Sequence, residues 1–499
     1  MPYSTLHIPE NITIEMLIDK IRSYNQQADF DLVRLVYDFA AKAHEGQFRK
    51  SGEPYIIHPL SAAYILAGMK IEVNIILATL LHDVPEDTKV TLEEIEKNFG
   101  SDIASMICGI TKLGKLKYRG VERYIENLRK MFIAMAEDVR VMIIKFADRI
   151  HNLTTLSVLP DKKRYRIALE SLEIYAPIAH RLGMGEFKGM LEDLSFPYVY
   201  PKEYARTKEL RDKILEGTEA YIEKIIDEIK NELTLANVQF IEVYGRKKQL
   251  YSFYQKLRKK DWETDKIYDT LALRVIVPSI GDCYATLGII HKLWKPLKGR
   301  IKDYIAQPKP NGYKSLHTTV FAHHGKIVEF QIRTPGMHED AEYGVAAHWL
   351  YDENGARRPA AEIAWAKELA HIQQEVLNKL SDLEQLKIDF FQNHIFAFTP
   401  QGDVIDLPED ATPVDFAYQI HSEIGNTCSQ ARVNDALVKL DTPLKSGDVV
   451  EIITDKNRKG PSPDWMKFVK THVARSHIKS SIKKKSLAAW LRGILPRKH

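Results

Sequence analysis

The spacing of apolar residues divides the chain into a helical first part and a mixed second part. Across residues 12–195, apolar side chains recur every three or four positions, as in "LVRLVYDFAAKAH", and no stretch alternates for long. This pattern predicts an almost continuous series of helices. The segment "FPYVYP" at 196–201 is expected to interrupt the series, which then resumes to about Ala236.

The pattern changes near residue 238. The runs "VQFIEVYG", "LALRVIVP" and "HTTVFAHHGKIVEFQIRT" are rich in β-branched residues, whereas "DCYATLGIIHKLW" between them has helical spacing. A later β-rich stretch contains one helix, with Thr412 as its N-cap and Pro413 at its first position. These features predict two further folded parts after the helical one, the first mixed α/β and the second small.

A chain of 499 residues is too long for one hydrophobic core, so we predict a multidomain fold. The expected parts are an all-α helical domain, a helical linker, a mixed α/β domain, a helical spacer, a small β-rich domain and a basic helical tail. Their predicted bounds are, in the same order, 1–195, 196–237, 238–350, 351–392, 393–456 and 457–499.

Composition places the chain among globular proteins. Hydrophobic residues make up 44% and charged residues 28%. No apolar stretch reaches the roughly 18 residues of a membrane span, and the first residues lack a signal-peptide pattern. The three cysteines are isolated, which fits neither a disulfide framework nor a zinc site. We therefore expect a cytoplasmic protein without a membrane span.

The net charge of +4 conceals three basic clusters. Residues 465–499 contain ten Lys or Arg and no acid, residues 246–260 contain seven and no acid, and residues 295–314 contain six against one acid. Such clusters favour polyanions, namely nucleotide phosphates in a concave site or nucleic acid on a face. A solvated surface is the alternative interpretation of any single cluster.

The stretch "ATLLHDVPEDT" places four ionisable groups directly after an apolar run. Pro85 cannot continue a helix, so the apolar helix should end near Asp83 and leave Glu86 and Asp87 on the following turn. His82 and Asp83 would then project into the helical interior. Thr91 and Glu94 form a capping box that starts the next helix.

Two other predicted helices carry matching groups. "PYIIHP" offers His58, and "IIKFADRIHNL" offers Asp148 and, one turn later, Asn152. Imidazole nitrogens with carboxylate oxygens suit a divalent ion such as Mn²⁺ or Zn²⁺ better than Ca²⁺. The alternative is that each histidine pairs with a local aspartate in the core.

This set resembles the HD-domain metal phosphohydrolases. A metal would lower the pKa of a bound water, and Glu86 and Asp87 would orient or deprotonate that water. Arg49 and Lys50, just upstream of His58, are placed to meet a phosphorylated substrate. We therefore expect metal-assisted hydrolysis of a phosphate ester.

The mixed α/β part offers the groups that phosphoryl transfer requires, which are cations for phosphates, carboxylates for Mg²⁺ and an aromatic ring for a base. Asp269 and Glu329 lie on strand-like runs, and Tyr313 lies in the turn "PNGYKS". The candidate cations are Arg246, Lys248, Lys256, Lys302 and Lys309.

Together these motifs make the whole chain resemble the long RelA/SpoT-type enzymes, which synthesise and hydrolyse guanosine tetra- and pentaphosphate, (p)ppGpp, in the bacterial stringent response. The strings that carry the resemblance include "LLHDVPEDT", "FADRIHNL", "HRLGMGEFKGMLEDLSF", "GRIKDYIAQPKPNGYKSLHTTV", "EFQIRTPGMHEDAEYGVAAHW" and "DFAYQIHSEIGNTC". The resemblance implies an HD-type hydrolase domain, a nucleotidyltransferase-like synthetase domain and a β-grasp TGS domain for the three folded parts.

The resemblance also implies residue roles in the hydrolase. One Mn²⁺ would be held by His58, His82, Asp83 and Asp148, with Glu86 and Asp87 catalytic. Arg49, Lys50 and Asn152 would meet the nucleotide, whose 3′-pyrophosphate is removed to regenerate GTP or GDP.

In the synthetase, the resemblance implies that pyrophosphate passes from ATP to the 3′-hydroxyl of GTP or GDP. ATP would be held by Arg246, Lys248 and Lys256, and the guanine nucleotide by Lys302, Lys309, Asn311, Tyr313 and His317, with the Tyr313 ring on the guanine. Asp269 and Glu329 match the Mg²⁺ and base positions, and Gln331 lies beside the attacking hydroxyl.

Two local sequences refine this picture. Arg300-Ile301-Lys302-Asp303 resembles the R-x-K-D form that the family's bifunctional members carry. Gln249 stands where the family string usually has histidine, next to the ATP-side cations. The resemblance further implies C-terminal regulatory modules beyond His499, so the chain is expected to be a short form or a part of a longer protein.

The TGS domain of long family members senses the acceptor end of uncharged tRNA on the ribosome, and His421 matches the residue that meets the tRNA 3′ end. A histidine that caps its own helix is the alternative. The basic tail, with Ile, Leu and Trp interleaved, is typical of an RNA- or ribosome-facing helix, and membrane-surface binding is the competing interpretation.

The leading hypothesis is a bifunctional synthetase and hydrolase. A second hypothesis is a hydrolase-dominant enzyme with a weak synthetase. A third is a tRNA- or ribosome-binding sensor with vestigial catalytic domains, which predicts missing catalytic residues. Both residue sets are complete in the sequence, which favours the enzyme.

Overall fold

The computed structural model separates the chain into two compact units, Met1–Gln374 and Glu375–His499. Each unit is described by itself. The described residues are 8–114, 131, 134, 137–246, 249–263, 271–309, 312–349, 394–401, 404–445, 447–455, 458, 460–471 and 473–481. The predicted spacer 351–392 and the tail after residue 481 lie outside them.

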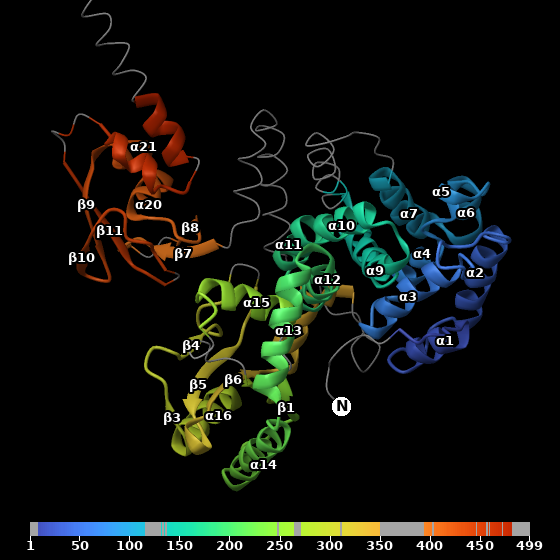
Figure 1. The fold of residues 1–499 in the computed structure, drawn as a ribbon, viewed down its shortest axis with the longest axis horizontal. Coiled ribbons are helices and arrows are strands. Elements are labelled where there is room, and N and C mark those ends of the chain that lie inside the picture. Colours follow the sequence, from blue (N-terminus) through green and yellow to red (C-terminus); the bar gives the residue numbers. More distant parts are fainter. Residues whose placement is uncertain are drawn as a thin grey trace, which may run out of the picture. The chain divides into compact units, whose positions relative to one another are not determined.

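The first part of unit one is helical, as the apolar spacing predicts (Figure 1). Its α-helices are α1 (Ile14–Arg22), α2 (Phe30–Ala43), α3 (Ile57–Gly68), α4 (Val73–Leu81), α5 (Val84–Asp87), α6 (Leu92–Phe99), α7 (Ser101–Gly114), α9 (Arg140–Thr154), α10 (Asp161–Glu170), α11 (Ala176–Arg181) and α12 (Gly185–Val199). Helices α3, α4 and α9 are buried along most of their length, so they form the centre of this part.

Helix boundaries follow the local signals closely in two places. Helix α4 ends at Leu81, and Pro85 lies in the first turn of the short helix α5. Glu86 and Asp87 are therefore in one helical turn rather than in an irregular one. Thr91 and Glu94 form the expected capping box at the start of α6.

The break expected at 196–201 begins later than predicted. Helix α12 continues through Pro197 to Val199, and α13 (Pro201–Leu215) starts after Tyr200. Phe196 is buried, with its ring 4.9 Å from that of Tyr254. This packing stabilises the last turn despite the hydrogen bond that proline removes, so the prediction of a break before Tyr200 was wrong.

The second part of unit one contains a six-stranded mixed sheet. Its strands run in the order β1-β2-β6-β5-β3, with β4 also paired to β5, and only β2 and β6 are parallel. Their bounds are β1 (Glu242–Arg246), β2 (Leu271–Ile276), β3 (Lys295–Pro296), β4 (Lys302–Asp303), β5 (Leu316–Phe321) and β6 (Ile327–Arg333). The helices here are α13, α14 (Glu219–Leu235), α15 (Leu250–Lys259), α16 (Ile280–Leu293) and α17 (Pro335–Tyr343).

One face of this sheet is apolar and the other is polar. Side chains such as Val243, Leu273 and Phe330 form a core with α14 and α16. Successive residues of a strand point to opposite faces, so the residues between them share the other face. The register pairs Arg246 with Ala272, Arg274 with Gln331, and Gln331 with His317 across that polar face.

Unit two is a small β-rich module, as predicted, but it contains two short helices where the sequence predicted one. Its strands are β7 (His394–Phe398), β8 (Val404–Pro408), β9 (Cys428–Val433), β10 (Ala436–Val438) and β11 (Val450–Thr454), and its helices are α20 (Pro413–Ile420) and α21 (Ser422–Thr427). Thr412 caps α20, with Pro413 at the first position, as expected. The fold class predicted from the sequence is confirmed for the described residues.

The start of the basic tail is part of unit two. Trp465, Val469 and Ile478 are buried in one cluster with Val414 and Tyr418 of α20. The ring of His477 stacks on that of Tyr418 at 5.6 Å. The first described residues of the tail therefore complete the core of this module.

None of the helices in the described ranges combines the length and the apolar character that a bilayer span requires.

Asp415 joins the tail to α20, and this contact can be tested. Its buried carboxylate accepts hydrogen bonds from Thr412 and from the backbone N–H groups of Lys470 and Thr471, at 2.7–2.9 Å. Asp415→Ala should lower the free energy of unfolding of unit two by about 3 kcal/mol, because several buried donors lose their acceptor. Hydrogen exchange of β9 and β11 should report this loss, and Asp464→Asn, at an exposed ion pair, should not change it.

Candidate functional site

His82 presents a bare ring nitrogen to the interior of the helical part. Its Nδ1 donates a hydrogen bond to the carbonyl of Thr79 at 2.7 Å, which leaves a lone pair on Nε2. The side chain is 1% exposed, and Nε2 has no hydrogen-bond partner among the described residues. Asp83 Oδ1 lies 3.1 Å from this nitrogen. In the neutral ring, a lone pair thus faces a carboxylate in a buried site, an arrangement that a cation stabilises.

His58 has the same orientation through a chain of hydrogen bonds. Arg49 Nη1 donates to His151 Nδ1 at 3.0 Å, so this nitrogen is an acceptor. His58 Nδ1 then donates to it at 2.7 Å, and His58 Nε2 faces Asp148 Oδ1 at 3.2 Å. Burial lowers the pKa of His58 and lowers that of His151 to about 2, so both rings are neutral near pH 7.

These side chains fit a divalent metal ion. Ligand atoms of His58, His82 and Asp148 all lie within 4.8 Å of one another, and all three residues are buried. Asp83 adds a carboxylate 3.5 Å from His58. Two unprotonated imidazole nitrogens with carboxylates are a donor set for a borderline divalent ion. The structure thus brings the four expected ligands together.

Asp148 is held in its charged form. Burial alone would raise the pKa of its carboxyl, but the Lys145 ammonium at 2.6 Å and the neighbouring His58 hold that pKa well below its usual range. Asn152 Nδ2 also donates to Asp148, and Arg49 donates to Asn152 Oδ1 at 2.6 Å. Arg49 and Asn152 therefore orient the cluster as well as standing at its edge, whereas Lys50 is exposed.

Glu86 and Asp87 follow the cluster in α5. Tyr55 donates to Asp87 Oδ2 at 2.7 Å and lies 3.0 Å from Asp83 Oδ2. Partial burial raises the pKa of the Glu86 carboxyl, and Lys145 opposes this shift. Glu86 thus has a raised proton affinity, whereas Asp87 is fixed by Tyr55.

Sequence reasoning missed three residues of this site. His151 lies three positions after Asp148, on the same face of α9, and a helical-wheel count of "FADRIHNL" could have found it. Lys145 lies three positions before Asp148 and could have been found in the same way. Tyr55 gave no signal, because its contact with α5 depends on how α3 and α4 pack.

The polar face of the sheet forms the second candidate site. His317 Nδ1 lies 3.0 Å from Glu329 Oε1, and its Nε2 lies 2.7 Å from the Tyr313 hydroxyl. Gln331 donates to Glu329 at 3.4 Å, and Lys302 pairs with His317 in the β4–β5 register. Five of the predicted residues therefore meet on one surface.

Two ionisable groups on this face, Glu329 and Lys309, have strongly shifted pKa values. Burial would raise the pKa of Glu329, but the His317 hydrogen bond and nearby Lys256 and Arg246 lower it to about 2. Burial of the Lys309 ammonium, together with the nearby cations Lys302 and Lys188, lowers its pKa to about 8. The Lys309 ammonium lies 4.9 Å from the centre of the Tyr313 ring.

An ion-pair network that the sequence did not predict holds the polar face. Arg274 pairs with Glu342 of α17 at 2.6 Å, and Arg333 pairs with the same carboxylate at 3.3 Å. Arg333 is 2% exposed and also donates to the Tyr313 hydroxyl at 2.5 Å. Two buried guanidinium groups on one carboxylate leave excess positive charge next to Tyr313, which favours an anionic ligand.

Three predicted synthetase residues, Lys248, Asp269 and Asn311, lie outside the described residues. Lys256 is exposed on α15, and Arg246 ends β1 on the polar face. Their cationic groups both lower the pKa of Glu329, so they lie on its side of the sheet.

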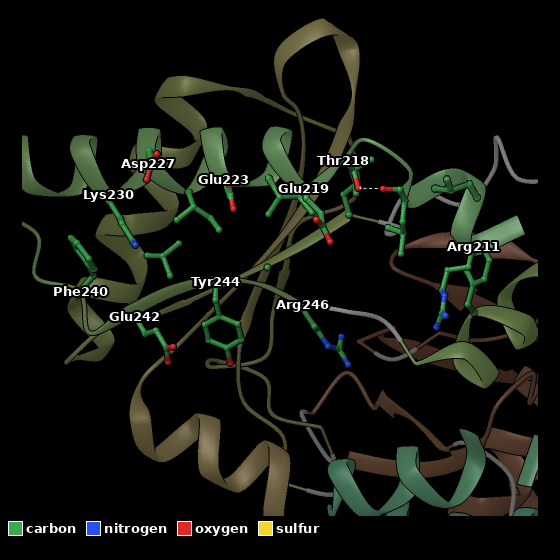
Figure 2. A pocket seen from close by; sticks show the side chains of 18 of the residues that line it. Arg211, Thr218, Glu219, Glu223, Asp227, Lys230, Phe240, Glu242, Tyr244 and Arg246 are labelled. Carbon is green, nitrogen blue, oxygen red and sulfur yellow. Dashed lines mark hydrogen bonds between the residues drawn. The ribbon is translucent and has the colours of Figure 1, made fainter. Parts of the chain in front are cut away.

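A cavity of about 1000 Å³ lies between α14 and β1 (Figure 2). Figure 2 shows Glu242, Tyr244 and Arg246 extending from β1 away from α14. The α14 side of the cavity carries Glu219 and Glu223 beside isoleucines. Arg211, Lys230 and Arg246 also line the cavity, so its walls carry both signs of charge. Arg246, one of the phosphate-binding candidates, therefore borders this cavity.

His421 of unit two is exposed and acts as the N-cap of α21, where its Nδ1 accepts the Glu423 N–H at 3.3 Å. The capping interpretation therefore holds for Nδ1. A tRNA contact by the other ring nitrogen stays a prediction.

Comparison with known protein families divides the chain into three matched regions. Residues 37–185 match the HD domain, residues 245–356 match a region found in RelA / SpoT proteins, and residues 395–454 match the TGS domain. These descriptions agree with the helical part, the mixed sheet and unit two, respectively.

Curated relatives match almost the whole chain. A guanosine-3′,5′-bis(diphosphate) 3′-pyrophosphohydrolase of Aquifex aeolicus is 45% identical over 96% of this chain and 68% of its own length. The bifunctional (p)ppGpp synthase/hydrolase SpoT of Escherichia coli is 45% identical over 94% of this chain and 67% of its own. A GTP pyrophosphokinase of Myxococcus xanthus is 45% identical over 93% and 62%. The chain thus spans about two thirds of the length of these relatives.

The orientation of the histidines makes a prediction about metal binding. His82→Ala should weaken binding of a divalent ion at least about 100-fold, because it removes a buried ligand whose partners cannot move to replace it. Calorimetric titration with Mn²⁺ measures this. The control His324→Asn, at an exposed residue with positive φ, should bind as tightly as the wild type. Equal Mn²⁺ affinity of the wild type and both variants would contradict the assignment of His82 as a metal ligand.

Proposed function

The chain belongs to the RelA/SpoT family, and from this premise we propose that it is a cytoplasmic enzyme that both synthesises and hydrolyses (p)ppGpp. The observation that carries the proposal is the presence of two separate constellations of predicted site residues in unit one. One is a buried cluster of metal-ligand type among helices, and the other is a cationic polar face on a mixed sheet. The first suits hydrolysis of a phosphate ester and the second suits pyrophosphate transfer.

For the hydrolase, we propose that His58, His82, Asp83 and Asp148 hold one Mn²⁺. When bound, the ion would lower the pKa of a water molecule and polarise a phosphoryl oxygen. Glu86, with its raised pKa, accepts a proton near neutral pH more readily than an ordinary glutamate.

Substrate recognition in the hydrolase depends on the residues at the edge of the cluster. Arg49 would bind the nucleotide while it holds His151, and Asn152 would do so while it holds Asp148. Asp87, fixed by Tyr55, would orient the attacking water. Exposed Lys50 would neutralise substrate phosphate charge.

For the synthetase, we propose that the 3′-hydroxyl of GTP or GDP attacks the β-phosphorus of ATP, the bond to the α–β bridging oxygen breaks, and AMP leaves. Arg246, Lys248 and Lys256 would hold ATP. Lys302, Lys309, Asn311 and His317 would hold the guanine nucleotide, with the Tyr313 ring on the base and Gln331 beside the attacking hydroxyl.

Asp269 and Glu329 would hold Mg²⁺ in the synthetase. A carboxylate with a pKa of about 2 is a weak proton acceptor at neutral pH, which favours metal binding over the base role for Glu329. The excess positive charge of Arg274 and Arg333 around Glu342 would attract the nucleotide phosphates.

For unit two, we propose that the TGS domain binds uncharged tRNA on the ribosome, with His421 at the tRNA 3′ end. Exposure of this residue supports the proposal, since its Nδ1 is engaged in capping and Nε2 can still meet a partner. The basic part of the tail would contribute contacts with RNA phosphates.

Separate variants should abolish one reaction each. Glu329→Ala should lower (p)ppGpp synthesis by several orders of magnitude, because positioning of the metal supplies much of the catalysis in phosphoryl transfer. His82→Ala should abolish Mn²⁺-dependent hydrolysis for lack of a ligand. Chromatography of nucleotides, after incubation with ATP and GTP or with (p)ppGpp, measures both. Loss of both activities in either variant, with normal thermal stability, would contradict two independent sites.

Lys309 predicts a pH dependence of guanine nucleotide binding. Its ammonium is charged below its pKa of about 8 and becomes neutral above it, so the GTP KM should rise as the pH passes from 7.5 to 9. The groups that set this pKa are the cations Lys302, Lys188 and Arg333, with Glu329 opposing them. Lys309→Arg should flatten the profile, because guanidinium stays charged. A wild-type GTP KM that stays constant over this range would refute a phosphate contact by Lys309.

A further inference from the structure

Helix α15, which carries Lys256, begins without a cap of its own. Its N-cap residue, Gln249, makes no side-chain hydrogen bond to the first turn. The cap comes instead from Asp193 of α12, whose carboxylate accepts the N–H of Leu250 at 3.1 Å and that of Tyr251 at 2.8 Å. A carboxylate here satisfies two orphan donors and complements the helix dipole.

The Gln249 side chain adds a second contact between the same helices. It lies directly over Gly189 of α12, where a Cβ atom would come within 1.4 Å of Gln249 Nε2. Gln249, which lies next to the ATP-side cations in the sequence, thus packs against α12. The start of α15 is held by one hydrogen-bonded contact and one packing contact, one turn apart on α12.

The position of α15 determines where the ATP-side cations lie. Arg246 is the last residue of β1, and α15 begins only four residues later. Arg246 and Lys256 both act on the carboxylate of Glu329. Arg246 precedes the first turn of α15 and Lys256 follows it. A shift of that turn would therefore move these cations relative to Glu329.

We propose that Asp193 is a positioning residue for the ATP side of the synthetase, acting through the first turn of α15. The proposal rests on the proposed function, since it takes Arg246, Lys248 and Lys256 as the ATP contacts. It assigns to a helix of the hydrolase-side bundle a role in ATP affinity. Among the described residues, the hydrogen bonds of the Asp193 carboxylate come from backbone N–H groups of α15, so its effect on ATP is indirect.

The test is steady-state kinetics of the full chain with Asp193→Ala. Loss of the cap should raise the ATP KM about 5-fold, the size of effect that a missing helix cap produces in an equilibrium. The GDP KM and Mn²⁺-dependent hydrolysis should stay within twofold of the wild type, because Tyr313, His317 and the metal cluster lie on other elements. A merely structural role would weaken ATP binding, GDP binding and hydrolysis together.

A local cap should rescue the variant. Gln249 has extended backbone angles, φ −61° and ψ 138°, which suit a capping side chain. Gln249→Asp in the Asp193→Ala background should therefore bring the ATP KM back toward the wild-type value. Glu192→Gln is the matched control, since Glu192 is a buried neighbour on α12 that faces Lys188 and does not cap α15. Its ATP KM should be unchanged.

Three outcomes would overturn the proposal. They are an unchanged ATP KM in Asp193→Ala, a parallel loss of GDP binding and hydrolysis in that variant, and a double variant that stays as weak as the single one. A wild-type chain that makes no (p)ppGpp from ATP and GDP would refute the proposed function itself. The wild-type assay thus separates the two failures.

Discussion

The helical part of the protein is organised around one buried negative charge. A carboxylate such as Asp148 is stable in a protein interior only if neighbouring groups compensate its charge. Lys145 and Asn152 do so from the same helix, and Nε2 of His58 and of His82 each faces a carboxylate, an arrangement that favours a cation at this point. The buried helices α3, α4 and α9 each contribute a group to this arrangement.

Helix α12 connects this arrangement to the synthetase sheet by direct contact. Its Phe187 ring lies 5.7 Å from that of Phe146, two residues before Asp148 in α9. Farther along, Gly189 and Asp193 hold the start of α15. Near its start, the Gly185 Cα faces the carbonyl of Ala341 in α17, so closely that no side chain fits. One helix thus contacts elements of both sites.

Local signals predicted much of this correctly. Capping residues identified the starts of α6 and α20, and Pro85 marked the end of α4, because these signals act through neighbours in sequence. Pro197 led to the wrong prediction of a helix break before Tyr200, because tertiary packing of Phe196 stabilises a helical turn that local rules disfavour. Trp465 fell within the predicted basic helical tail, 457–499, and its burial against α20 could not be read from a basic sequence.

The sequence by itself determined the fold class, the family and the residue types of both sites, because chemistry and periodicity are written in local order. The tertiary structure alone decided which ring nitrogen of His58 and of His82 faces the carboxylates of Asp148 and Asp83, because each tautomer depends on a hydrogen-bond partner. It also decided that Glu342 joins Arg274 to Arg333, and that Asp193 caps a helix 57 residues away. Such contacts join residues far apart in the chain, and only the packing of whole helices and strands brings them within hydrogen-bond distance.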